Sequence, residues 1–118
     1  MQRIVRALGC CVLVSSLAAC VVESPQAVAP PAAPNPHEIA VHRYAQVEGR
    51  LDDMSRHIDE RVNRGYYPPR EGDALHHRLD AIRQQANQMA AQRGGGLSGD
   101  EQRTLNDELD TESIAINR

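Results

Sequence analysis

Lysine, phenylalanine and tryptophan are absent from the chain, and three tyrosines are the only aromatic residues among 118. Large aromatic side chains normally supply the biggest buried areas of a core, so their scarcity excludes a large one. Basic residues are outnumbered as well, since 13 arginines stand against 16 acidic residues and the formal net charge is −3. Phosphate neutralisation needs a basic surface, and this balance argues against a nucleic-acid partner.

Cysteine is confined to the start of the chain, at Cys10, Cys11 and Cys20. The same segment begins with two arginines and continues with an apolar stretch over residues 7–17. This stretch is shorter than the roughly 20 apolar residues that span a bilayer. Its proportions are those of the apolar region of a secretory signal peptide.

The apolar stretch ends in the motif L-A-A-C at positions 17–20, which resembles the lipobox of bacterial lipoproteins. The resemblance implies cleavage between Ala19 and Cys20, and a diacylglyceryl group and an N-linked acyl chain on Cys20. Several acyl chains together anchor a protein durably. Because Val21 and not aspartate follows Cys20, the resemblance also implies sorting to the outer membrane. An ordinary signal peptide with a boundary cysteine, or an uncleaved anchor, is the alternative.

Cleavage would also remove the other cysteines. Cys10 and Cys11 leave with residues 1–19, and the lipid occupies the thiol of Cys20. No thiol then remains for a disulfide, a metal site or a nucleophile.

Residues 20–36 are rich in proline and alanine, with five prolines between positions 25 and 36. Proline at this density prevents a helix and excludes a central strand. The segment is predicted to be a disordered, extended tether, which at about 3.1 Å per residue reaches on the order of 50 Å. A proline-rich ligand for a partner is the alternative, although no basic residue flanks a P-x-x-P there.

Residues 37–118 carry apolar residues at helical spacing and are predicted to form one all-α domain. Helices are expected over about 38–64, 69–93 and 98–116. In the first two, apolar residues alternate steps of three and four, as in an a/d heptad seam. These seam residues are Tyr44, Val47, Leu51, Met54, Ile58, Leu75, Leu79, Ile82, Ala86 and Met89.

The two seams match in an antiparallel hairpin. When two helices run antiparallel, the residue numbers of every facing pair add up to the same total, as they do here for Ile58 with Leu75 and for the other pairs of the seam. Each pair also joins an a position to a d position, as antiparallel coiled coils require. The same register is expected to place Glu48 near Arg83, Arg64 near Glu71, and His57 toward Arg78.

A third helix is introduced by Ser98 and Glu101, which are spaced as a capping box. Leu105 and Leu109 continue the apolar face of this helix, whereas Glu112 falls where an apolar residue would fit. The hairpin is therefore predicted to extend to an up-down-up three-helix bundle whose last helix frays easily.

A G-x-[LY]-x-x-x-E pattern occurs twice, ending at Glu71 and at Glu101. It resembles the second half of an EF-hand loop, in which calcium takes six to eight oxygen ligands. At the first three ligand positions one copy has no carboxylate, and the other has only Glu60 and places Arg64 in the site. Glu71 and Glu101 are therefore predicted to cap helices rather than to bind calcium.

The same pattern resembles that of small uncharacterised proteobacterial periplasmic proteins with repeated G-x-L-T-x-x-E hairpins. Residues 97–101 are also partly similar to the L-T-x-x-Q motif of CpxP/Spy-type periplasmic stress chaperones. That similarity implies, as an alternative function, a helical binder of unfolded proteins.

The spacing of histidines and serines predicts neither a metal site nor catalysis. No two histidines are four residues apart, as ligation from one helix requires. His76 and His77 are expected to reach Asp73 or Asp80 on their own helix. No serine of the helical domain has a triad-like setting. The residues considered are His37, His42, His57, His76, His77, Ser55, Ser98 and Ser113.

The sequence thus predicts an outer-membrane lipoprotein, facing the periplasm or the cell surface, whose helical domain is a non-catalytic structural or protein-interaction module. Its expected partners are the membrane, through Cys20, and a protein or a second copy of the chain. No nucleic acid, cofactor or small-molecule substrate is expected. A stress chaperone or metal-responsive sensor of the CpxP/Spy type is the alternative, and an accessory subunit of an envelope machine is a third.

Overall fold

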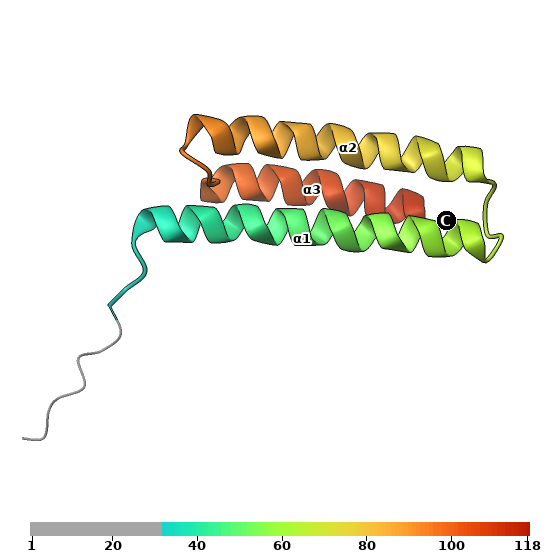
Figure 1. Ribbon diagram of the computed structural model, residues 1–118, viewed down its shortest axis with the longest axis horizontal. Coiled ribbons are helices and arrows are strands. Elements are labelled where there is room, and N and C mark those ends of the chain that lie inside the picture. Colours follow the sequence, from blue (N-terminus) through green and yellow to red (C-terminus); the bar gives the residue numbers. More distant parts are fainter. Residues whose placement is uncertain (1–31) are drawn as a thin grey trace, which may run out of the picture. The chain divides into compact units, whose positions relative to one another are not determined.

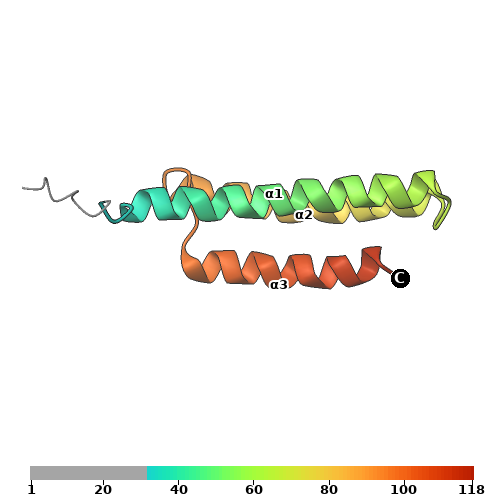
Figure 2. The same ribbon diagram turned by 90° about the horizontal axis from the view of Figure 1, so that it is seen from below.

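The computed structural model describes residues 32–118, which form three helices (Figure 1). These are α1 (Pro36–Asn63), α2 (Pro69–Gln92) and α3 (Gly99–Ile116). They run up, down and up, and each helix packs against the other two (Figures 1 and 2). Residues 32–118 contain no strand. The predicted all-α, three-helix bundle is confirmed.

The first helix begins earlier than predicted. Pro36, expected to be the last residue of the tether, is the first residue of α1. Asn35 is the N-cap, and its side chain accepts a hydrogen bond from the Glu38 amide at 2.8 Å, while the Glu38 carboxylate accepts one from the Asn35 amide at 3.2 Å. Proline suits this first position because its missing N–H would have no partner inside the helix.

Both turns begin with a glycine in the left-handed conformation, with φ of 75° at Gly65 and 72° at Gly94. In each turn a hydrogen bond spans five residues, from Tyr66 to Arg61 and from Gly95 to Ala90. This is the bond that closes a Schellman motif. The sequence repeat pairs Gly65 with Gly95, whereas the helix-ending glycine of the second turn is Gly94, because that turn is one residue longer.

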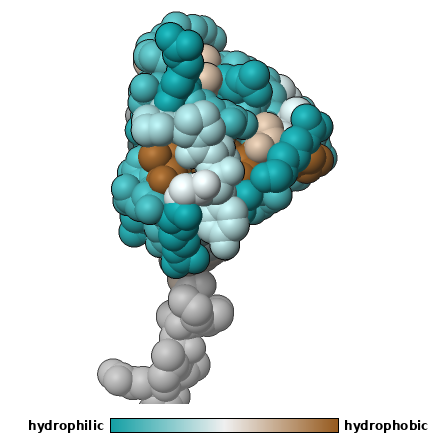
Figure 3. Space-filling model, turned by 90° about the vertical axis from the view of Figure 1, so that its right-hand side faces the viewer, coloured by the Kyte–Doolittle hydropathy of each residue, from teal (hydrophilic) through white to brown (hydrophobic). Residues whose placement is uncertain are grey.

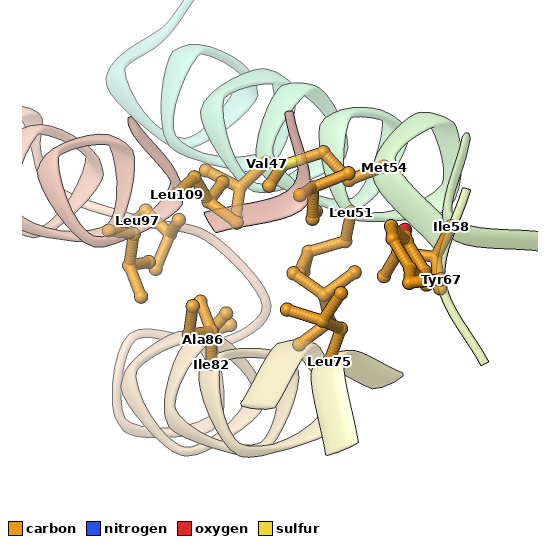
Figure 4. Packing of buried hydrophobic residues seen from close by; sticks show 14 residues of the cluster. Val47, Leu51, Met54, Ile58, Tyr67, Leu75, Ile82, Ala86, Leu97 and Leu109 are labelled. Atoms are coloured by element: carbon orange, nitrogen blue, oxygen red, sulfur yellow. The ribbon is translucent and has the colours of Figure 1, made fainter. Parts of the chain in front are cut away.

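The core contains only apolar side chains and runs along the bundle axis (Figure 4). Of the predicted seam, Tyr44 and Met89 are only partly buried, and the others are buried. Three further residues from the turns and the end of α2 complete the core and were not predicted in the seam, namely Tyr67, Ala90 and Leu97. The buried residues are Val47, Leu51, Met54, Ile58, Tyr67, Leu75, Leu79, Ile82, Ala86, Ala90, Leu97, Leu105, Leu109 and Ile116.

Polar contacts beside the core confirm the antiparallel register of α1 and α2. Arg83 pairs with both Glu48, at 3.3 Å, and Asp52, one turn further along α1. In the register predicted from the seams, Arg83 lies opposite a point on α1 midway between these two partners. The predicted contact between Arg64 and Glu71 is wrong, because Arg64 lies 4.0 Å from Glu60 of its own helix.

Helices α1 and α3 are parallel and joined by polar side chains along their length. Arg50 donates to the Asn106 side chain at 2.9 Å and also pairs with Asp110. One turn earlier, Gln102 donates to Gln46 at 2.8 Å. Surface pairs of this kind contribute little to stability individually. Together, however, they fit only one displacement of α3 along the axis of α1.

Candidate functional site

The residues predicted to carry the lipid anchor lie outside the described part of the chain. These are Cys20, together with Ala19 at the predicted cleavage position. No helix within residues 32–118 combines the length and the apolar character needed to cross a bilayer.

The two glutamates predicted as helix caps differ. Ser98 and Glu101 exchange hydrogen bonds at 3.1 and 2.8 Å at the start of α3. The Ser98 amide and the Arg93 side chain hold the pKa of the Glu101 carboxyl below its ordinary value. Glu71 does not cap α2, contrary to the prediction, because the N-cap there is Pro68, whose side chain has no acceptor and whose nitrogen carries no proton.

The carboxylate of Glu101 already has hydrogen-bond partners, which matters for the resemblance to an EF-hand calcium loop. Its Oε2 lies 2.8 Å from both the Ser98 amide nitrogen and the Arg93 Nε, and Oε1 accepts from Arg93 at 3.0 Å. A calcium ligand would have to give up these partners, so the geometry favours the capping role.

His76 links α2 to α1 through both of its ring nitrogens. Its Nδ1 lies 3.1 Å from the Ser55 hydroxyl, and its Nε2 lies 2.8 Å from Asp59 Oδ1. The prediction that His76 reaches an aspartate on its own helix is wrong, and so is the prediction that Ser55 lacks a triad-like neighbourhood. Spacing along one helix could not show this arrangement because its three members come from two helices.

The backbone of α1 at Ser55 does not offer what acyl transfer would require in addition to this hydroxyl–imidazole–carboxylate chain. A serine nucleophile needs free N–H groups nearby to stabilise the oxyanion. Ser55 lies in the middle of α1, where backbone N–H groups donate to the carbonyls four residues earlier. The geometry therefore suits a hydrogen-bonded link between α1 and α2 better than a nucleophile.

The remaining histidines lie apart. His37 and His42 are exposed near the start of α1, and His77 is exposed on α2. His57, predicted to point toward Arg78, instead lies 3.1 Å from the Asn117 side chain after α3. Within residues 32–118 no three His, Cys, Asp or Glu side chains are grouped as a metal ion would require.

Beside His76, the end of α1 and the start of α2 enclose a groove of about 340 Å³. Its lining combines Val62, Pro69 and Gly72 with the carboxylates of Asp59 and Asp73. Asn63 and His76 complete the lining. A few polar groups beside apolar residues are a common lining of binding sites. We define these seven residues as the α1–α2 groove.

Gly72 determines how closely the two helices approach at this groove. It is buried, and a Cβ atom at this position would lie 2.5 Å from Val62 Cγ2 and 3.6 Å from Ile58 Cγ2. Glycine inside a helix is destabilising by roughly 0.5–1 kcal/mol relative to alanine. The close contact with Val62 gives a packing reason for glycine here, one that sequence reasoning missed.

The α1–α2 turn presents an exposed aromatic ring. Tyr66 is 64% exposed, and the Arg61 guanidinium lies 4.8 Å from the centre of its ring. Arg61 also donates to the Arg118 carbonyl at 2.9 Å, which joins the end of α1 to the end of the chain after α3. Tyr67 is buried, and burial raises the pKa of its hydroxyl.

The surface at this end of the bundle is mainly hydrophilic, with small separate areas of apolar side chains (Figure 3). In the described residues the large apolar side chains that are exposed are Ile39, Val41, Tyr66 and Ile114. Tyr66 is thus an isolated exposed aromatic on the α1–α2 turn and not part of a broad apolar patch.

No protein-family model, curated protein or solved structure was found to match the chain.

Proposed function

We propose that the protein is a lipid-anchored lipoprotein of the outer membrane, facing the periplasm, whose helical bundle is a non-catalytic protein-interaction module. The lipobox-like motif at positions 17–20 and the proline-rich segment after it support the anchor and the tether. The observation that carries the interaction role is the exposed ring of Tyr66 on the α1–α2 turn.

The placement of these features suits a tethered module. The N-terminus of the described chain and the α1–α2 turn lie at opposite ends of α1 (Figure 1). With 28 residues at about 1.5 Å each, α1 separates them by about 40 Å. A module attached at the start of α1 would hold Tyr66 at its far end. Tyrosine and arginine are also the residue types that dominate the energy of many protein interfaces.

The anchor is tested by labelling cells with a palmitate analogue. The full chain should incorporate the label and fractionate with the outer membrane, and Cys20→Ser should lose both properties. Cys11→Ser is the matched control and should keep them, because the resemblance assigns the lipid to Cys20 alone. Equal labelling of Cys20→Ser and the unsubstituted chain would contradict the anchor.

The interaction role is tested by site-specific photo-crosslinking in the envelope. A photoreactive residue at position 66 should give a discrete adduct with another protein. The same residue at position 84, which is exposed on α2 far from the turn, should not. Equal adducts from both positions, together with suppression of client aggregation by the purified protein, would point to the stress-chaperone alternative.

A further inference from the structure

The α1–α2 groove is bordered by negative charge that has few partners. Asp59 uses Oδ1 to accept from His76, and within residues 32–118 its other oxygen has no hydrogen bond. Asp73 forms no ion pair with any residue of the same range. No lysine or arginine lines the groove. The groove therefore presents two carboxylates to solvent, one from α1 and one from α2.

We propose that this groove receives an arginine side chain of a partner protein. The inference rests on the proposed role as an interaction module and names the chemistry that the module recognises. A guanidinium group is planar, can accept two carboxylates along its edges, and is weakly hydrated. Its aliphatic stem can lie against Val62 and Pro69 while its charge meets Asp59 and Asp73. The positive charge of arginine complements the two carboxylates of the groove, and this is why we assign an arginine side chain to it.

The shape of the groove supports a side chain as the occupant. A volume of about 340 Å³ is at the small end of the range for ligand sites, and Gly72 adds no side chain to the lining.

The test is a titration of the full-length chain, kept in detergent micelles, with the capped peptide Gly-Arg-Gly, followed by amide chemical shifts. Saturable shifts are expected at residues 59–63 and 72–76. The same peptide with citrulline in place of arginine keeps the shape but loses the charge, and it should bind several-fold more weakly. About 0.5 M NaCl should also weaken binding, because the carboxylates are exposed and salt screens them.

Matched variants identify the carboxylates responsible. Asp59→Asn and Asp73→Asn should each weaken binding of the arginine peptide about two- to fivefold, the range of an exposed ion pair. Asp53→Asn, an exposed aspartate of α1 outside the groove, should bind as the unsubstituted chain does. If Asp73→Asn fails to fold, Asp73→Glu preserves the charge and should retain binding.

Three results would overturn the assignment. Equal binding of the citrulline peptide would show that charge does not select the ligand. Tighter binding of spermidine than of the arginine peptide would identify a free polyamine. Self-association that disappears in Asp73→Asn would identify a second copy as the occupant. Each of these is independent of palmitate labelling at Cys20, so failure of the groove assignment and failure of the anchor are distinguishable.

Discussion

The amide N–H of Leu97 donates a hydrogen bond to the carbonyl oxygen of Ala40, with 2.9 Å between nitrogen and oxygen. Leu97 is fully buried, and Ala40 lies in the second turn of α1. The bond therefore attaches the α2–α3 turn to α1 just before α3 begins. The neighbouring Gly96 makes the approach possible, since a Cβ there would lie 2.6 Å from the Ala40 carbonyl carbon.

Gly96→Ala is expected to destabilise the bundle by about 1–3 kcal/mol, because the added methyl group overpacks a backbone contact that cannot move freely. Gly49→Ala is the control. Gly49 lies inside α1 with nothing within 4 Å of a Cβ, so alanine there should stabilise by about 0.5–1 kcal/mol. Urea unfolding followed by circular dichroism measures both, and equal effects of the same sign would disprove the close contact.

Ile116 and Ile114 provide a matched pair two residues apart in α3. Ile116 is 1% exposed and Ile114 is 61% exposed. Ile116→Ala should cost about 2–5 kcal/mol in the free energy of unfolding, because it leaves a cavity at the end of the core. Ile114→Ala should change it by less than about 0.5 kcal/mol. Similar losses in both variants would mean that the last turn of α3 packs differently.

Ser98→Ala should destabilise the start of α3 by about 1 kcal/mol, because the N-cap acceptor for the Glu101 amide is lost. Glu101 adds a dependence on pH. Its folded-state pKa is lowered by the Ser98 amide, so its stabilisation is complete above the unfolded pKa and disappears as the pH falls through the folded pKa.

Acid titration of stability checks this sign. Between about pH 5 and pH 3 the unsubstituted chain should lose more stability than Glu101→Gln, whose amide does not titrate in that range. Equal slopes for the two proteins would show that the Glu101 carboxylate does not stabilise the helix start. Glu71→Gln is the control, because Glu71 makes no capping hydrogen bond.

Glu112 is a half-buried carboxylate on the face of α3 that meets α2. Its side chain is 18% exposed, and its Oε2 is buried without a hydrogen bond, 3.6 Å from Arg78 Nη1. Replacing such a group by an apolar side chain is often stabilising, and Glu112→Leu should add about 1–2 kcal/mol. The control, Glu60→Leu, changes a carboxylate that is 60% exposed and should have little effect. A loss of stability in Glu112→Leu would show that the pair with Arg78 is net favourable.

Sequence reasoning predicted the helical seams well because side chains three and four residues apart share a face of any helix. The pairing of α1 with α2 followed from matching the spacing of the seam residues in one helix to that in the other. The boundaries were less accurate. The start of α1 at Pro36 was not predicted because Pro36 was assigned to the proline-rich tether, and the capping box formed by Asn35 and Glu38 was overlooked.

The candidate site was beyond such reasoning. Ser55, Asp59 and His76 meet because the rotation of each helix about its axis turns their side chains toward one interface. A residue can satisfy the same local spacing and face either neighbour, as His57 shows by lying beside Asn117 and not Arg78.

The sequence by itself determined three helices, the apolar seams and the antiparallel hairpin, since all of these depend on periodicity and on local capping. The tertiary structure alone decided that Gly96 lies against Ala40, that Gly72 lies against Val62, and that two carboxylates border one groove. These features depend on how closely particular backbones approach and on which side chains then face each other. Contacts between residues distant in the chain are set by packing and not by local spacing.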